Sequence, residues 1–314
     1  MDYKDKVEKR YKKISNYIRK TPLIYSNYFS NKFNSNIYLK FENIQYTGAF
    51  KIRGALSKII SLSREERKKT LITASGGNHG LGVCYAAKKF GMKAVVYLPK
   101  STPKMKIEKI KSLGGETIMY GEAWDEANIK AMQIADKKSR VYIHAFSDED
   151  VMLGQASVAY EILKEKKDID AIICSIGGGG LISGVSRYAK SFNPKIKIFG
   201  VETRGADAMF RSINAKRLIT LDAITSIAES LGAKRVTELS FNYVKQYVDK
   251  LFVVPDSKAI NVLIEILDKE KQLVEPASSC SLAACKNIKD IKGKNVAVVI
   301  CGGNFPLKKL KNYI

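Results

Sequence analysis

A lysine with the potential for chemistry lies in the stretch 41–54. Lys51 follows Thr47-Gly48-Ala49-Phe50 and opens an apolar run that continues to Ile60. A lysine at the lip of a glycine-containing turn, just before a helix, can extend its amine into a cleft beside an aromatic side chain, here Phe50. Such an amine acts as a nucleophile and a base once burial lowers its pKa. Lys51 is therefore a candidate catalytic residue, although most lysines in proteins lie on the surface.

Four consecutive glycines, Gly177, Gly178, Gly179 and Gly180, stand between an apolar segment at 171–175 and a helix that continues through Leu181. Without side chains, the backbone N–H groups of such a loop can converge, and the helix N-terminus adds a positive potential. A tight turn alone needs fewer glycines, so we expect this loop to bind a phosphate group. The Gly-x-Gly-x-x-Gly spacing of dinucleotide-binding proteins is absent at the first strand.

A second glycine-containing loop has the sequence Ser75-Gly76-Gly77-Asn78-His79. It follows an apolar segment and precedes a helix, so its N–H groups are also expected to face an anion. His79 has the chemistry of a general acid or base, but a structural role is favoured at this position. A further segment, Cys301-Gly302-Gly303-Asn304, follows an apolar strand at its carboxyl end, where the sites of α/β proteins collect.

Short apolar runs that alternate with helical patterns must position these side chains. We expect strands at 38–42, 71–74, 94–98, 117–120, 141–143, 171–175, 197–201 and 296–300. We expect helices at 3–20, 52–60, 81–90, 104–112, 123–138, 152–166, 180–192 and 257–270. Continuous apolar strands are typical of parallel sheets that are buried on both faces. The order predicts an α/β protein with two doubly wound lobes: residues 66–145 form a smaller lobe, inserted into a larger lobe of residues 1–65 and 146–314.

The composition excludes several classes of protein. The chain has 314 residues, 45% of them hydrophobic and 27% charged, which is ordinary globular composition. No apolar run reaches the length of a membrane span, and no secretory signal opens the chain. The net charge is +23, but the lysines are dispersed and are not interleaved with aromatic residues, so we expect no nucleic-acid partner. The five cysteines lack metal-binding spacing and indicate a reduced, cytoplasmic protein.

Lys51, the 75–79 loop and the tetraglycine loop together, in this order and spacing, resemble the fold-type II pyridoxal-phosphate enzymes. The resemblance is to the threonine/serine dehydratase branch, which also contains serine racemase, and it extends from about residue 18 to residue 304. It implies the fold-type II architecture, with the active site in the cleft between the two lobes. It also implies a homodimer and an amino-acid substrate.

The resemblance implies a role for each motif. Lys51 is expected to bind the cofactor aldehyde covalently, with Phe50 beside the cofactor ring. The tetraglycine loop with Leu181 is expected to bind the cofactor phosphate. Asn78 is expected to bind the 3-hydroxyl, and Cys301 to face the ring nitrogen as a neutral, weak donor. The remaining residues of the second loop, with Asn78, are expected to bind the substrate carboxylate (Ser75, Gly76, Gly77 and His79).

Gly76 distinguishes between two activities of this branch. The racemases carry a serine at that position, and its hydroxyl protonates the face of the substrate opposite the lysine. Glycine has no such group, so the resemblance favours dehydration of L-threonine or L-serine to a 2-oxo acid and ammonia. The alternatives are serine racemase and a dehydratase for another β-hydroxy amino acid such as 3-hydroxyaspartate. An acidic substrate needs a further cation, for which Arg53, Arg204 and Arg235 are candidates. The remote alternative is a basic, non-catalytic nucleic-acid-binding protein.

The sequence does not decide whether the protein binds a divalent or monovalent cation. Glu202 and the Ala206 carbonyl match two ligands of the cation site in racemase-like relatives, but the third, a carboxylate, falls here on Ala208. Two further acidic residues match segments near the substrate side chain and below the cofactor ring, respectively Glu229 and Glu275. For both, structural and functional roles are equally supported.

Overall fold

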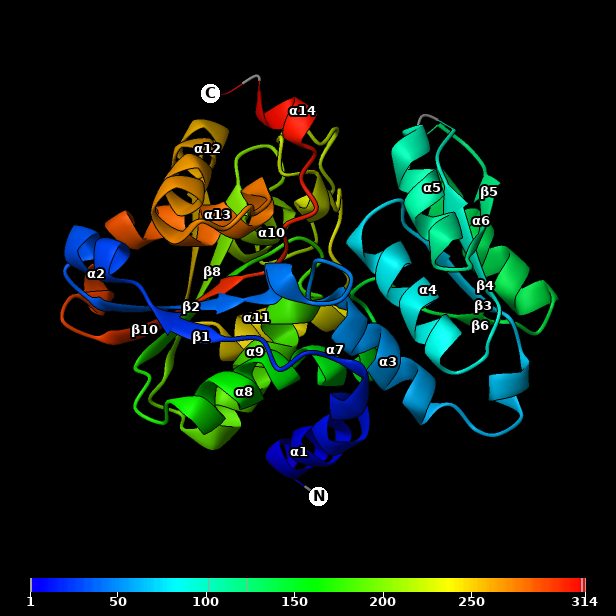
Figure 1. The fold of residues 1–314 in the computed structure, drawn as a ribbon, viewed down its shortest axis with the longest axis horizontal. Helices are drawn as coiled ribbons and strands as arrows, with labels where there is room; N and C mark the ends of the chain where they lie inside the picture. Colours follow the sequence, from blue (N-terminus) through cyan, green and yellow to red (C-terminus); the bar gives the residue numbers. More distant parts are fainter. Residues whose placement is uncertain (1, 101, 123, 312, 314) are drawn as a thin grey trace.

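The computed structural model describes residues 2–100, 102–122, 124–311 and 313, and it contains two β-sheets (Figure 1). The larger sheet has six strands in the order β1-β2-β10-β7-β8-β9, and the smaller has four in the order β5-β4-β3-β6. Each is a doubly wound sheet with helices on both faces. The expected α/β architecture with two lobes is confirmed.

The larger sheet is parallel except at one edge, where β1 pairs antiparallel with β2. Its central strands are buried along almost their whole length, as their continuous apolar sequences predict. The six strands are β1 (Leu23–Tyr25), β2 (Asn36–Phe41), β7 (Ala171–Ser175), β8 (Lys197–Thr203), β9 (Lys250–Val254) and β10 (Asn295–Ile300).

Helices cover both faces of this sheet (Figure 1). One face carries α1 (Tyr3–Ile14), α7 (Glu149–Gln155), α8 (Ser157–Glu165), α9 (Gly180–Phe192) and α11 (Glu238–Tyr247). The other carries α12 (Asp256–Glu265) and α13 (Pro276–Ala283). Helices α2 (Asn27–Phe33), α10 (Ala208–Ala215) and α14 (Leu307–Leu310) also belong to this lobe.

The smaller sheet consists of β3 (Leu71–Ala74), β4 (Ala94–Leu98), β5 (Glu116–Met119) and β6 (Val141–Tyr142), all parallel. Alternating side chains of β3 and β4 point to opposite faces and so belong to two different cores. One core packs against α4 (Asn78–Lys89) and α5 (Lys104–Ser112), and the other against α6 (Trp124–Lys137). The loops at the carboxyl ends of these strands face the larger lobe.

Helix α3 (Lys51–Ser61) connects the two lobes in a way that the sequence pattern does not indicate. Its apolar side chains, among them Ile52, Leu56 and Ile59, share one core with residues of the smaller sheet and of α4. The same helix also packs against α7 of the larger lobe. The predicted lobe boundary at residues 65/66 therefore divides a shared core, and the boundaries stay a prediction.

Several elements differ from the expected pattern. The helix expected at 152–166 is two helices, α7 and α8, which meet at Ala156. The helix expected at 257–270 ends as an α-helix at Glu265 and continues as a π-helical segment over 266–270. Strands β1 and β9 and helices α2, α10, α11, α13 and α14 were not predicted, because short or weakly periodic segments carry little signal in sequence.

Lys40, Glu42, Arg53 and Glu161 form a charged cluster buried in the core of the larger lobe, with side chains at most 1% exposed. The Arg53 guanidinium donates to Glu42 at 2.7 Å and to Glu161 at 2.8 Å, and the Lys40 amine donates to Glu161 at 2.6 Å. Coulombic attraction and hydrogen bonds from these cations hold the pKa of Glu161 below its usual value despite its burial. Arg53 is therefore a structural residue, and the hypothesis that it binds an acidic substrate is wrong.

We expect Glu161→Gln to lower the free energy of unfolding by about 3–5 kcal/mol, because it leaves buried Arg53 and Lys40 with an uncompensated charge. Urea denaturation measures this change. A matched control lies one turn further along α8, where exposed Glu165 pairs with Lys20 at 3.2 Å. Glu165→Gln should change the stability by less than about 1 kcal/mol. Equal effects of the two substitutions would contradict the structural role of the buried cluster.

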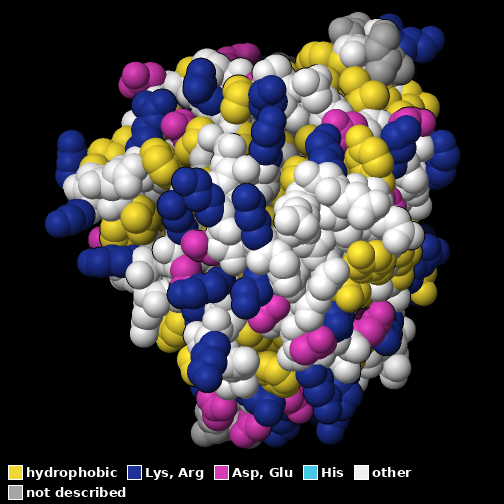
Figure 2. Space-filling view, turned by 90° about the vertical axis from the view of Figure 1, so that its left-hand side faces the viewer, with side chains coloured by type: hydrophobic (Ala, Val, Ile, Leu, Met, Phe, Trp, Pro, Cys, Tyr) yellow, Lys and Arg dark blue, Asp and Glu magenta, His cyan; other side chains and the backbone are white. Residues whose placement is uncertain are grey.

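The surface is basic but mixed. On the face shown in Figure 2, Lys and Arg side chains are spread over the surface among acidic, apolar and uncharged groups. Among the described residues, no helix is long and apolar enough to cross a membrane.

Candidate active site

A cavity of about 560 Å³ lies between the two lobes. All of the residues predicted to bind a cofactor or a substrate line it, namely Phe50, Lys51, Ser75, Gly76, Gly77, Asn78, His79, Gly177, Gly178, Gly179, Gly180, Leu181 and Cys301. The two sheets contribute the carboxyl ends of β3, β6, β7 and β10 to it, which explains why segments far apart in the sequence meet here. Glu202 and Ala206 are not among the lining residues.

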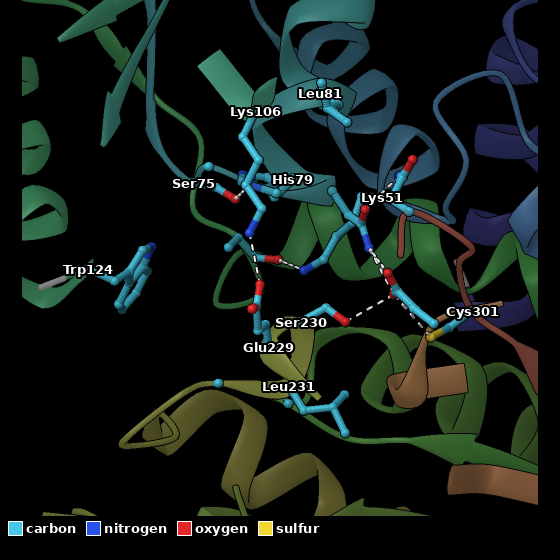
Figure 3. Close-up of a pocket in the computed structure, with 18 of the residues that line it drawn as sticks. Lys51, Ser75, His79, Leu81, Lys106, Trp124, Glu229, Ser230, Leu231 and Cys301 are labelled. Carbon is cyan, nitrogen blue, oxygen red and sulfur yellow. Dashed lines mark hydrogen bonds and ion pairs between the residues drawn. The ribbon is translucent and has the colours of Figure 1, made fainter. Parts of the chain in front are cut away.

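Lys51 is the first residue of α3, and its side chain extends into the cavity (Figure 3). Its amine donates a hydrogen bond to the Ala145 carbonyl at 2.7 Å and lies 5.3 Å from the centre of the Phe50 ring. Burial lowers the pKa of Lys51 to about 8, and the neighbouring Cys301 and Glu275 only partly oppose this shift. About a tenth of the amine is thus uncharged at pH 7, far more than for an ordinary lysine, and able to act as a nucleophile or base.

The tetraglycine loop leaves unpaired donors at the cavity. Within the described part of the chain, the N–H groups of Gly177, Gly178 and Gly179 donate no hydrogen bond, and no side chain caps α9. Gly179 has φ = +92°, a conformation that favours glycine. A Cβ atom at Gly178 would lie 2.2 Å from the ring of Phe146. The loop is therefore restricted to glycine and presents free amides at a helix N-terminus, as an anion site requires.

Asn78 begins α4 and is held by partners from the other lobe. Its amide nitrogen lies 2.9 Å from Glu275 Oε1, and its oxygen accepts a hydrogen bond from Asn304 at 2.7 Å. Ser230 also donates to Glu275, at 3.0 Å. Burial raises the pKa of Glu275, and the hydrogen bonds from Asn78 and Ser230 oppose that shift.

Cys301 lies at the end of β10, with its thiol 3.2 Å from the Ser278 hydroxyl and 3.5 Å from the Ser175 hydroxyl. Burial raises the pKa of Cys301 to about 12, with a further contribution from Glu275. The thiol therefore stays neutral at physiological pH. A neutral thiol is a weak donor and does not protonate a pyridine nitrogen.

His79 is buried and does not have the properties of a general acid at neutral pH. Its Nε2 lies 3.1 Å from the Ile143 carbonyl, and burial together with the Lys51 charge lowers its pKa to about 3. The neutral ring donates from Nε2 and connects α4 to the segment after β6. This arrangement supports the structural role that the sequence favours.

Sequence reasoning missed several residues of the cavity. Ala145 and Phe146 follow β6 and contact Lys51 and the tetraglycine loop. Their position just after a strand of the smaller sheet was the signal that could have identified them. Three lysines also line the cavity, Lys106, Lys109 and Lys309, whereas the candidate cations Arg204 and Arg235 do not.

The lysines and Glu229 connect the two lobes at the mouth of the cavity. Lys106 of α5 forms an ion pair with Glu229 at 2.9 Å (Figure 3), and Lys309 of the larger lobe contacts the other carboxylate oxygen. Lys109 donates to Asn304 at 2.8 Å. Hydrogen bonds from Lys309 and Lys106 keep the pKa of Glu229 low against the effect of its burial.

The predicted cation ligands lie elsewhere, at α10. The Glu202 carboxylate accepts hydrogen bonds from the backbone amides of Met209 at 3.0 Å and Phe210 at 2.6 Å. Burial raises the pKa of Glu202 to about 8. Among the described residues, no group of three or more His, Cys, Asp or Glu side chains is arranged to hold a metal ion. The Glu202 carboxylate is thus already engaged in hydrogen bonds at the N-terminus of α10. The cation site stays a prediction.

Comparison with known proteins is consistent across sequence and structure. Residues 14–302 match the family described as pyridoxal-phosphate dependent enzymes. The chain belongs to this family. It is 38% identical over 301 residues to an L-threonine ammonia-lyase of Thermotoga maritima, covering 96% of this chain and 75% of that protein.

Solved structures show the same relationship. A serine racemase of maize superposes with a TM-score of 0.93 at 32% identity, covering 98% of this chain and 95% of that one. A processed threonine deaminase isoform of Solanum lycopersicum superposes with a TM-score of 0.91 at 30% identity, covering 98% and 92% respectively. The predicted membership of the fold-type II family and its pyridoxal phosphate cofactor are confirmed.

The residues of this pyridoxal-phosphate-dependent enzyme fit the cofactor. The free amides at α9 suit its phosphate, the Lys51 amine suits its aldehyde, and the neutral Cys301 thiol suits its ring nitrogen. The individual roles of these residues are our proposal.

Because only the uncharged amine is nucleophilic, we expect covalent capture of the cofactor to depend on pH. The pKa of Lys51 is lowered to about 8, so the amine is uncharged above that value. Below pH 8 the rate of capture by the apoenzyme should rise about tenfold per pH unit, and it should level off above pH 8. Stopped-flow absorbance at several pH values measures this rate. A rate that keeps rising to pH 10 would contradict the lowered pKa.

Proposed function

We propose that this enzyme is a threonine/serine dehydratase, an ammonia-lyase that converts L-threonine or L-serine to a 2-oxo acid and ammonia. The proposal rests on two features of the site taken together: the pKa of the Lys51 amine is lowered, and position 76 is a glycine. This combination provides one base and no hydroxyl donor at Gly76. The names of the relatives, L-threonine ammonia-lyase and threonine deaminase, support the same activity.

The chain's own groups account for the elimination. Bound pyridoxal phosphate supplies an aldehyde that joins covalently to an amine and a ring that accepts the electrons left at Cα. The Gly77 N–H donates to the Ser75 hydroxyl at 3.2 Å, and the other N–H groups of the 75–79 loop, free within the described part of the chain, hold the substrate carboxylate at the N-terminus of α4. The Lys51 amine removes the Cα proton, and the β-hydroxyl takes up one proton and leaves as water, so the substrate loses one H and one OH in all. The released enamine tautomerises and hydrolyses to the 2-oxo acid and ammonia, so one water is lost and one is taken up.

The binding groups act by position and not by proton transfer. Asn78 is fixed by Glu275 and Asn304 before any ligand arrives, so little reorganisation is needed on binding. The neutral Cys301 thiol leaves the ring nitrogen unprotonated, which favours rapid elimination over a long-lived carbanion. The neutral His79 takes no part in proton transfer.

An activity assay with three substrates tests the proposal. The purified holoenzyme is incubated with L-threonine, L-serine or 3-hydroxyaspartate, and both 2-oxo acid and ammonia are measured. We expect 2-oxobutyrate from L-threonine or pyruvate from L-serine, in equal amounts with ammonia. Absence of oxo acid from both substrates would contradict the proposal.

A second candidate, a dehydratase for an acidic β-hydroxy amino acid, is favoured by one observation. Lys106, Lys109 and Lys309 line the cavity, and Glu229 is the acidic partner of two of them. These lysines could bind a second carboxylate. A higher kcat/KM for 3-hydroxyaspartate than for L-threonine would establish this activity instead.

Gly76→Ser tests the reason for preferring elimination over racemisation. A Cβ at position 76 would lie 3.2 Å from a Thr102 methyl and 3.4 Å from Leu98, which a small adjustment accommodates, and the backbone needs no glycine. We expect the ratio of racemisation to elimination of L-serine to rise about tenfold or more, because the new hydroxyl supplies a proton donor. Chiral chromatography and the oxo-acid assay measure the two rates. Gly76→Ala is the control for added volume and should leave the ratio unchanged.

We also propose that the enzyme is a cytoplasmic homodimer. The five cysteines are free and buried, which suits a reducing compartment. The dimer rests on family resemblance, and light scattering of the purified protein tests it.

A further inference from the structure

A second cavity, of about 510 Å³, lies away from the active site, beside α1, α7 and α9. These helices lie together on the lower side of the molecule in Figure 1. Five basic and two acidic side chains line the cavity, an excess of three positive charges. The lining residues are Tyr3, Lys6, Lys9, Arg10, Lys13, Glu149, Asp150, Leu153 and Arg187.

The basic residues of α1 lie on one face of the helix. Lys6, Lys9, Arg10 and Lys13 are spaced i, i+3, i+4 and i+7, which places them on the same side. At 1.5 Å per residue, the row from Lys6 to Lys13 spans about 10 Å. Such a row suits an elongated ligand with several negative charges better than a single small ion.

The two acidic residues of the cavity are already neutralised. Asp150 accepts from Arg10 at 3.0 Å, and Glu149 accepts from Arg187 at 2.8 Å. Among the described residues, no carboxylate lies within ion-pair distance of Lys6, Lys9 or Lys13. The charges of these three lysines are therefore available to a ligand.

On the opposite wall of the cavity, packing holds the charged side chain in a fixed position. The Arg187 guanidinium lies 4.0 Å from the ring centres of both Tyr3 and Tyr243, so two aromatic rings fix its position. The Tyr3 hydroxyl is buried and makes no hydrogen bond within the described part of the chain. A buried hydroxyl without a partner is unusual, and it leaves hydrogen-bonding capacity beside Arg187.

We propose that this cavity binds a small molecule carrying several linked phosphate groups. The lysines of α1 bind the phosphates along one side, and the Arg187 guanidinium, which also pairs with Glu149, donates to them from the other. The site is separate from the tetraglycine loop, which takes the phosphate of the cofactor. Its ligand is thus distinct from the cofactor and from the amino-acid substrate.

Isothermal titration calorimetry with sodium tripolyphosphate tests this site. The holoenzyme is used, because in the apoenzyme the free amides of the tetraglycine loop would also bind the probe. The ionic strength is held constant with sodium chloride. We expect one equivalent to bind per chain, and Lys9→Gln and Lys13→Gln each to weaken binding by roughly three- to fivefold. Lys12→Gln, which removes an exposed lysine of the same helix from outside the cavity, should have little effect.

Three outcomes would overturn the proposal. If tripolyphosphate does not bind the holoenzyme, the cavity is not a phosphate site. If Lys12→Gln weakens binding as much as Lys9→Gln does, the attraction is diffuse surface charge. If vesicles of phosphatidylglycerol bind while tripolyphosphate does not, the basic face contacts a lipid surface instead of a soluble ligand.

Discussion

The variant Lys51→Ala should lose both turnover and the absorbance of the covalently bound cofactor. Removing the amine removes the group that captures the aldehyde and the base that takes the Cα proton, so we expect kcat to fall by about 10²–10⁴-fold or more. Absorption spectroscopy and the oxo-acid assay measure the two effects. Added methylamine should restore part of the activity, which a merely misfolded variant would not show.

A matched control lies two turns further along the same helix. Lys58 forms an ion pair with Asp148 at 2.7 Å and does not line the cavity. Lys58→Ala should keep the absorbance of the bound cofactor. Turnover by Lys51→Ala at the wild-type rate would contradict the proposed mechanism, whatever the absorption spectrum of the variant shows.

Gly178→Ala should weaken cofactor binding by roughly 5- to 150-fold, which corresponds to about 1–3 kcal/mol of overpacking. A methyl group at this position would lie 2.2 Å from the ring of Phe146, so the loop or the ring has to move. Movement of the loop separates the N–H groups that we propose to bind the phosphate. Fluorescence titration of the apoenzyme with pyridoxal phosphate measures the affinity.

A double variant separates the steric cause from other effects. In Gly178→Ala/Phe146→Ala the ring that causes the collision is gone, so part of the lost affinity should return relative to Gly178→Ala. Phe146→Ala alone provides the reference for the loss of the ring. If Gly178→Ala binds the cofactor as tightly as the wild type, the tetraglycine loop does not hold the phosphate.

Local sequence patterns were sufficient to locate the loops that carry the candidate site residues. The boundaries of β3, β4, α5, β7 and α9 agree with the expected ranges, because continuous apolar runs and glycines mark buried strands and their ends. In a parallel α/β fold, loops after the strands meet at one edge of the sheet. The family resemblance placed the residues around Lys51, Gly76 and Gly177 in one cleft, because Gly76 and Gly177 follow strands of two different sheets, which this rule alone does not bring together.

Contacts between distant residues required the tertiary structure. The hydrogen bonds that join Asn78 to Glu275 and Asn304 span about 200 residues of sequence, and no local pattern specifies them. Arg53 matched the chemistry of a substrate-binding cation, yet packing of α3 buries it against two carboxylates. Three lysines line the mouth of the cavity instead, and two of them are paired with Glu229.

The sequence by itself determined the fold class, the family and part of the set of residues that line the cavity, because these depend on residue type, order and local periodicity. The tertiary structure decided the protonation states of Lys51, His79 and Cys301, because burial and neighbouring charges set each pKa. It also decided that α3 joins both lobes and that α1 faces a second, basic cavity. Those properties arise only when helices and sheets pack together and exclude water.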